Sequence, residues 1–161
     1  GELAATEMAL GAMLWWNGDA ASALQRYRRA RARLEAALEL DPGSPAIRSR
    51  LGVRLNGIGN TLGWTGDSEG AVASLEDGLE LLRSVAAESG RGPDLVGSII
   101  VGTMWLGENE LELGRAAAAE ASYREAFALA SELAEADPRD AADARRAYLL
   151  GAKIGDALGS G

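Results

Sequence analysis

The stretch from Leu51 to Asp67 reads LGVRLNGIGNTLGWTGD and contains the pattern that decides the fold. Aliphatic residues recur in it at intervals of four, three and four positions: Leu51, Leu55, Ile58 and Leu62. This spacing places them on one face of an α-helix. We expect Gly66 to end that helix in the left-handed conformation, and Asp67 to cap a second helix. The stretch therefore predicts a helix, a tight turn and the start of another helix.

The same pattern returns every 48 residues along the chain. Four glycines keep this spacing, each directly after a leucine or an isoleucine: Gly11, Gly59, Gly107 and Gly155. Two other sets of small residues repeat with it, namely Gly18, Gly66 and Gly114, and Ala23, Ala71 and Ala119. Agreement at so many positions without an insertion indicates an internal repeat. We therefore expect residues 1–161 to form a single array of similar units.

Each unit reads as two helices, and no segment alternates with period two for long enough to predict a strand. We expect about seven helices, near residues 2–17, 19–40, 44–65, 67–88, 93–113, 115–136 and 140–159. The units are predicted at about 1–43, 44–91 and 92–139, followed by an unpaired helix at 140–161. Both ends interrupt the repeat register, so the chain is expected to be a fragment of a longer protein. The predicted fold class is all-α.

Glycine inside a helix needs a physical reason, because it costs about 1 kcal/mol relative to alanine. Gly59 comes one position after Ile58, which is expected to face the core. A missing side chain there would let the second helix of the unit approach closely, with Ala71 as the small residue opposite. Gly107 and Ala119 would repeat this contact in the next unit.

The repeat resembles the tetratricopeptide repeat (TPR). Positions that carry the resemblance in the first unit are Leu10, Gly11, Leu14, Gly18, Asp19, Ala23, Tyr27, Ala30 and Pro42. The third unit repeats them at Leu106, Gly107, Gly114, Ala119, Tyr123, Ala126 and Pro138. The period is 48 rather than the family's roughly 34 residues, so each helix would be about two turns longer, as in long-helix bacterial arrays. At Glu110 the chain departs from the pattern, which has an apolar residue there.

The resemblance implies an α-solenoid of antiparallel helix pairs that form a right-handed superhelix, with the first helix of each pair on a concave, partner-binding face. The expected partner-binding residues on that face are Met8, Trp15, Trp16, Asn56, Asn60, Trp64, Met104, Trp105 and Glu108. Aromatic residues and methionine are enriched in interface cores. An alternative interpretation is that the tryptophans fill the core of unusually long helices.

Asn60 could hold the backbone of a bound peptide, because its amide group both donates and accepts hydrogen bonds; a solvated polar residue is the alternative interpretation. Grooves of this family that grip a C-terminal carboxylate use lysine and arginine with asparagine. Asn56 and Asn60 have no lysine beside them on the predicted face, so that binding mode is not expected.

The composition argues against most catalytic chemistry. The chain has no histidine and no cysteine, which excludes Ser-His-Asp and Cys-His triads, disulfides and the usual zinc sites. Glu108, Glu110 and Glu112 are interpreted as a solvated run, and the acidic residues Asp137, Asp140 and Asp143 as favourable charges at a helix start. We therefore expect no enzyme activity, no cofactor and no metal site.

The net charge of −8 argues against a nucleic-acid partner, since such proteins are usually basic. Five arginines do cluster within eight residues: Arg26, Arg28, Arg29, Arg31 and Arg33. They are interpreted as a solvated helix face, or alternatively as a docking patch for an acidic partner. No apolar run is long enough to span a bilayer and no signal peptide is visible, so no membrane partner and a cytoplasmic location are expected.

These observations favour a non-catalytic scaffold that binds a peptide or helix of a partner protein in the concave groove. Two alternatives stay open. The chain could associate with itself as a homodimer, because terminal repeats without polar caps expose apolar surface. It could also be a regulatory segment of a larger bacterial protein such as a serine/threonine kinase, an expectation that follows from the family resemblance alone.

Overall fold

The structure, a computed structural model, describes residues 19–137, 145 and 149–154. Within these residues the helices with complete bounds are α2 (Ala20–Leu40), α3 (Pro45–Trp64), α4 (Ser68–Ser89), α5 (Pro93–Glu112) and α6 (Ala116–Ala136). Residues 149–154 are also helical, and the described part of the chain contains no strand. The prediction of an all-α fold is confirmed, and each of these five helices begins and ends within one residue of its expected range. The expected helix at 2–17 lies outside the described residues.

Side chains immediately before three of the helices cap their first turns. Asp19 and Asp67 each accept a hydrogen bond of 2.9 Å from the backbone N–H three residues later, and Ser44 accepts one of 3.5 Å in the same way. Pro45 and Pro93 occupy the first positions of α3 and α5, where a missing N–H leaves no hydrogen bond unmade. These local signals explain why the sequence predicts the helix starts well.

Helices α3 and α5, each the first helix of its repeat unit, end in the same kind of turn. Gly66 and Gly114 have φ angles of +89° and +72°, the left-handed conformation expected of them. In both turns the N–H of the next residue donates to a carbonyl five positions earlier, from Asp67 to Leu62 and from Arg115 to Glu110. The 48-residue repeat is therefore visible in the backbone hydrogen bonds. Gly18 lies outside the described residues.

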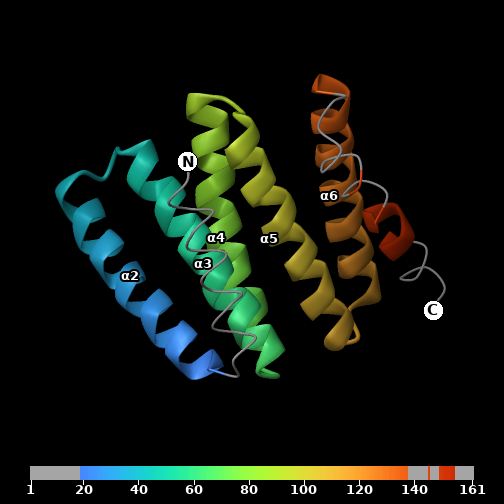
Figure 1. The fold of residues 1–161 in the computed structure, drawn as a ribbon, viewed down its shortest axis with the longest axis horizontal. Coiled ribbons are helices and arrows are strands. Elements are labelled where there is room, and N and C mark those ends of the chain that lie inside the picture. Colours follow the sequence, from blue (N-terminus) through green and yellow to red (C-terminus); the bar gives the residue numbers. More distant parts are fainter. Residues whose placement is uncertain (1–18, 138–144, 146–148, 155–161) are drawn as a thin grey trace.

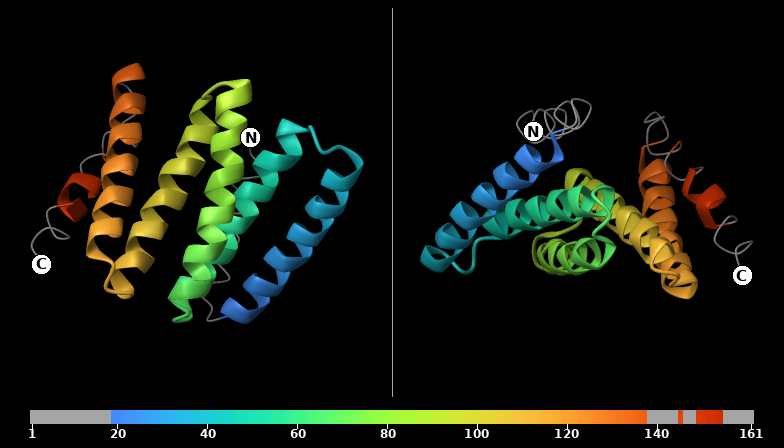
Figure 2. Two further views of the ribbon diagram at one scale, coloured as in Figure 1. Left: turned by 180° about the vertical axis from the view of Figure 1, so that it is seen from behind. Right: turned by 90° about the horizontal axis from the view of Figure 1, so that it is seen from below.

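Successive helices run antiparallel and form a stack (Figure 1). Helix α3 packs against α2, α4 and α5, and α5 packs against α4 and α6. Seen end-on, α4 lies to one side of α3 and α5, while α2 and α6 lie at opposite ends of the described stack (Figure 2). None of the described helices combines the length and apolar character that a membrane crossing requires.

Two groups of buried side chains form the core. One joins α4 to α5 and contains Val72, Leu75, Leu79, Leu82, Ile99 and Leu106. The other joins α5 to α6 and to residues 149–154, and contains Val96, Ile100, Ala119, Tyr123, Ala126, Ala130 and Leu150. Leu75 and Tyr123, which occupy equivalent repeat positions, belong to different groups.

The repeated glycines allow the close approach that the sequence predicts. A Cβ atom added at Gly59 would lie 2.5 Å from Leu75 Cγ and 3.0 Å from the carbonyl oxygen of Ala71. At Gly107 the nearest atoms are those of the Tyr123 ring, with Cε1 at 2.7 Å, and not those of Ala119, which was expected opposite this glycine. A side chain at either glycine would therefore force the two helices apart. Gly11 and Gly155, the other members of the set, lie outside the described residues.

Ion pairs join α4 and its flanking loop to α6. Arg83 lies 2.9 Å from Glu125, and Arg115, which precedes α6, lies 2.7 Å from Glu69. Arg91, in the loop after α4, lies 3.2 Å from Glu132 of α6. Between α2 and α4 the described residues form no such pair, and the register positions of Arg83 and Glu125 are there occupied by two acidic residues, Glu35 and Asp77. The ion pairs between α4 and α6 therefore have no counterpart between α2 and α4 within the described residues.

Candidate functional site: a cleft at the ends of the first helices

An open cleft with a volume of about 750 Å³ lies where α3 and α5 end. Its walls are the last turn of α3, the turn that leads into α4 and the last turn of α5. Tyr123 of α6 and Lys153 of the last described segment complete the lining. The cleft thus lies between the ends of α3 and α5, which both terminate at a glycine in the left-handed conformation.

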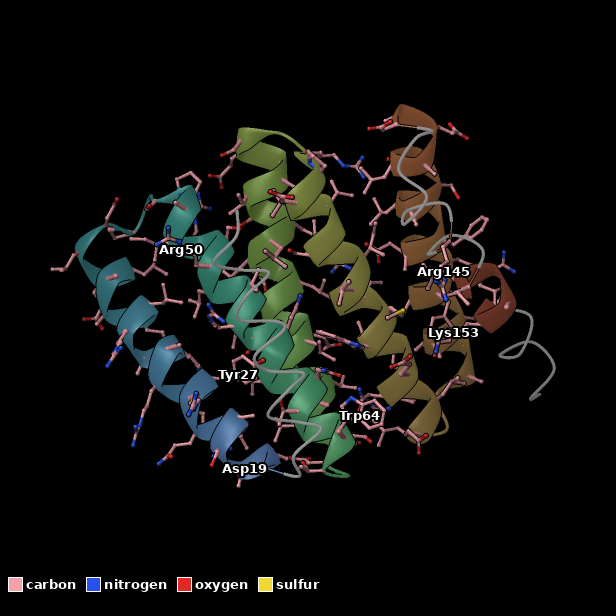
Figure 3. All side chains as sticks on the ribbon, in the orientation of Figure 1. Asp19, Tyr27, Arg50, Trp64, Arg145 and Lys153 are labelled. Carbon is pink, nitrogen blue, oxygen red and sulfur yellow. The ribbon has the colours of Figure 1, made fainter. Side chains whose placement is uncertain are left out.

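Trp64 is the most exposed aromatic side chain on the cleft. Its side chain lies at the end of α3, between α3 and α5 (Figure 3), and 61% of the residue is exposed. The indole Nε1 donates a hydrogen bond of 3.0 Å to Oδ1 of Asn60, one turn earlier on the same helix. Asn60 therefore orients the indole ring. The interpretation of Trp64 as a core residue is wrong, and its predicted role in binding a partner stays a prediction.

Charged groups surround the indole. Lys153 Nζ lies 2.6 Å from Glu108 Oε1 and 5.6 Å from the centre of the Tyr123 ring. Burial, reinforced by the negative charges of Glu108 and Glu110, raises the pKa of the Tyr123 hydroxyl. Tyr123 therefore stays a neutral hydroxyl at physiological pH. The predicted residue Glu108 lies in the cleft, but its carboxylate is already paired with the lysine.

Four carboxylates and one ammonium group line the cleft: Asp67, Glu69, Glu108, Glu112 and Lys153. Glu69 and Glu108 pair with Arg115 and Lys153. The lining as a whole therefore carries three more negative than positive charges, which gives the cleft an acidic character next to an exposed aromatic ring.

The floor of the cleft contains Asn109, which sequence reasoning did not single out. Asn109 is buried, and its Nδ2 donates a hydrogen bond of 2.9 Å to the carbonyl oxygen of Trp105. Its amide fits against Gly63 of α3, where an added Cβ atom would lie 2.8 Å from Asn109 Nδ2. The only signal for this contact in the sequence is Gly63, because a glycine inside a helix indicates that another residue comes close. It does not indicate that this residue is Asn109.

Asn56 lies in the interior, so its assignment to the partner-binding face is wrong. Only 4% of the residue is exposed, and its Nδ2 donates a hydrogen bond of 3.2 Å to the carbonyl oxygen of Ser98 in α5. The amide is enclosed by two glycines, Gly78 of α4 and Gly102 of α5, whose missing side chains leave room for it. Asn56 thus lies between three helices, and its Oδ1 has no hydrogen-bond partner among the described residues.

Two further predicted residues contribute mainly to the core. Met104 is half-buried and packs against the group that joins α5 to α6, and Trp105 is half-buried and packs against the group that joins α4 to α5. Neither lines the cleft. For Trp105 the core-filling interpretation therefore describes the structure better than the partner-binding one. Met8, Trp15 and Trp16 lie outside the described residues.

Glu110 is buried, so its interpretation as part of a solvated run of glutamates is wrong. Only 8% of the residue is exposed, and its carboxylate accepts a hydrogen bond of 2.8 Å from the hydroxyl of Ser122 in α6. Burial raises the pKa of this carboxyl group, while the hydrogen bond from Ser122 acts against that rise. The buried position that the family pattern assigns to an apolar residue is therefore occupied by an acid with a polar partner.

A lysine does reach the cleft, although none was expected beside the asparagines. Lys153 comes from the last described segment and lies on the same cleft as Asn60.

Of the acidic residues considered at the start of the last helix, Asp137 is exposed, whereas Asp140 and Asp143 lie outside the described residues. Among the residues that the structure describes, no three acidic side chains are grouped so that they could hold a metal ion.

The cleft thus combines an oriented indole ring, amide groups, carboxylates and an ammonium group, which are groups that bind a polar and partly apolar segment. Comparison with known proteins adds no assignment to this geometry. No protein-family model matches the chain, and no curated protein matches it.

Proposed function

We propose that this chain is a non-catalytic scaffold that binds a peptide or a helix of a partner protein in the cleft between the ends of α3 and α5. The proposal includes a TPR-like architecture of the long-helix type, in which the antiparallel helix pairs continue as a right-handed α-solenoid. The observation that carries it is the exposed indole of Trp64, which is held in place by Asn60 at the cleft.

An exposed tryptophan is unfavourable in a protein that has no partner for it, because its large apolar surface stays in water. Tryptophan is also one of the residues that most often carry binding energy at the centre of an interface. At Trp64 the hydrogen bond to Asn60 fixes the ring before a partner arrives, so less side-chain freedom is lost on binding. These features support a role as an anchor for a partner side chain.

The dimensions of the cleft limit what can enter it. Its volume of about 750 Å³ lies within the range of pockets that hold a small ligand or a few side chains. A whole α-helix, about 10 Å wide, would lie across the opening and insert only some of its side chains. The net negative charge of the lining favours a partner segment that carries arginine or lysine.

A selection from a displayed library of random peptides tests the proposal on the whole chain. We expect the selected peptides to contain basic and apolar residues, to quench the tryptophan fluorescence, and to bind Trp64→Ala at least about tenfold more weakly. Leu40→Ala is the matched control, since Leu40 is an exposed apolar residue at the end of α2, away from the cleft. Peptides that bind the wild type and Trp64→Ala equally would overturn the proposal.

A further inference from the structure

The charge of this chain is divided unevenly along its length. Residues 19–66 contain eight arginines and four acidic residues, which gives a net charge of +4. Residues 67–137 contain four arginines and fifteen acidic residues, which gives −11. Since α2 and α6 lie at opposite ends of the described stack, the molecule has a basic end and an acidic end (Figure 1).

Five of these eight arginines lie on α2. All five of its clustered arginines are exposed: Arg26, Arg28, Arg29, Arg31 and Arg33. Within the described residues only Arg31 forms an ion pair, at 2.7 Å from Glu35 on the same helix. Arg26, Arg29 and Arg33 follow the spacing i, i+3 and i+7, which places them in one row along the helix. We call these three residues the arginine row.

The arginine row cannot reach the cleft of its own molecule. Helix α2 packs on α3, where the ring of Tyr27 fits against Gly57, and it lies at the edge of the stack away from α5 (Figure 3). The cleft lies between the ends of α3 and α5, and α3 separates it from α2 (Figure 3). Contact between the two surfaces therefore requires two molecules.

We propose that the arginine row of one copy docks in the cleft of a second copy. A guanidinium group stacks on the exposed indole of Trp64, a contact that arginine makes readily with tryptophan. The other arginines of the row face the acidic rim, where Glu112 and Asp67 make no ion pair within the described residues. The row spans about 10 Å of helix, so its side chains can enter a cleft of this size. This inference rests on the proposed role of the cleft as a protein-binding site.

The two surfaces differ, so the contact is head-to-tail. Each copy bound through its arginine row still offers a free cleft, and such a contact continues into a ring or an open chain rather than stopping at a symmetric dimer. Because opposite charges contribute to the contact, association weakens as salt is added. Both properties separate this contact from a symmetric apolar dimer.

Molar mass measured by light scattering after size exclusion tests the inference on the whole chain, over roughly a hundredfold range of concentration. We expect masses above twice 16.7 kDa at low salt and a return toward 16.7 kDa at about 0.5 M salt, where the screening length is only a few ångströms. Arg29→Glu damages the row and Glu112→Arg damages the cleft, so each variant alone should remain a monomer. Arg50→Glu is the control, with the same charge change at an exposed position on α3.

Mixing the two variants gives the sharpest result. Arg29→Glu retains an intact cleft and Glu112→Arg retains an intact arginine row, so their mixture should form a one-to-one complex of twice 16.7 kDa and nothing larger. A wild type that is monomeric at every concentration at low salt overturns the inference, as does an assembly that Arg29→Glu or Trp64→Ala leaves intact. The proposed function fails separately, when selected peptides ignore Trp64.

Discussion

Gly52 of α3 and Gly78 of α4 face each other so closely that a Cβ atom added to either residue would lie 2.8 Å from the carbonyl oxygen of the other. The contact is reciprocal, and it brings two helix backbones together without an intervening side chain. Around it, Leu82 covers Gly52 and Leu55 covers Gly78. The backbones of α3 and α4 therefore pack directly against each other at this point, because neither position carries a side chain.

Gly52→Ala and Gly78→Ala should each reduce the free energy of unfolding by about 1–3 kcal/mol, because backbone atoms cannot move aside as a flexible side chain can. Chemical denaturation measures the change. Gly97→Ala is the control, since apart from the neighbouring backbone of α5 no atom of the described residues would lie within 4 Å of the added Cβ. There the better helix propensity of alanine should raise stability by up to about 1 kcal/mol. Equal effects at all three glycines would contradict this account of the α3–α4 contact.

The buried carboxyl group of Glu110 should make the stability of the fold depend on pH. Burial raises its pKa in the folded state, so its contribution is fully present below the unfolded pKa and is lost as pH rises through the folded pKa. Glu110→Gln keeps an acceptor for Ser122 without the charge. The variant should be more stable than the wild type by about 1 kcal/mol at pH 7, with no difference at low pH where the wild-type carboxyl is protonated.

Thermal unfolding across this pH range checks the prediction, with Glu112→Gln as an exposed control on the same helix. A stabilisation by Glu110→Gln that is the same at low and neutral pH would show that ionisation of Glu110 is not its cause.

Glu88 should affect stability in the opposite sense. Its hydrogen bonds with Arg48, one of them 2.8 Å long, hold the pKa of the Glu88 carboxyl below its usual value. Such a group stabilises the fold above its unfolded pKa, and the contribution is lost as pH falls through the folded pKa. Glu88→Gln should therefore lower the melting temperature at pH 7 and have no effect in strong acid. Glu80→Gln, at an exposed position on the same helix, should leave the melting temperature unchanged both at pH 7 and in strong acid.

Asn56 should tolerate an apolar substitute better than a charged one. Asn56→Leu loses one hydrogen bond to Ser98, worth about 1 kcal/mol, and removes an oxygen that already lacks a partner. Asn56→Asp leaves a carboxylate without a compensating charge between three helices and should reduce stability by about 3 kcal/mol or more at neutral pH. Denaturant midpoints at pH 7 and pH 4 check both, since the loss in Asn56→Asp should shrink in acid. A larger loss of stability in Asn56→Leu than in Asn56→Asp would contradict the buried, uncharged surroundings of Asn56.

The helix boundaries could be predicted because their signals are local. Ser44 followed by Pro45, and Gly66 followed by Asp67, determine the start and the end of α3 through backbone groups only a few residues away. The 48-residue repeat then transfers that information along the chain. The close contacts at Gly59 and Gly107 follow from the same register, since a glycine at a core-facing position indicates that another helix comes near.

The surroundings of individual polar residues could not be predicted in this way. The residue spacing along α3 indicates the face of the helix on which Asn56 lies. It does not indicate that α5 packs over this face, with Gly102 next to the Asn56 amide. Glu110 is satisfied by Ser122 of the following helix, and no spacing within α5 indicates this. Lys153 enters the cleft from 45 positions beyond Glu108. In each case the decisive partner lies on another helix, so only the packed structure identifies it.

The ion pairs Arg83–Glu125 and Arg115–Glu69 hold α4 to α6, whereas the equivalent places between α2 and α4 hold Glu35 and Asp77. Within the described residues α2 is held by its packing against α3, whereas α6 packs against α5 and is also joined to α4 by these ion pairs, each of which is weak alone. A pulling force applied along the stack would therefore separate α2 before it separates α6. Under such a force, the end of the stack that carries the arginines of α2 should detach first, while the helices that form the cleft stay together.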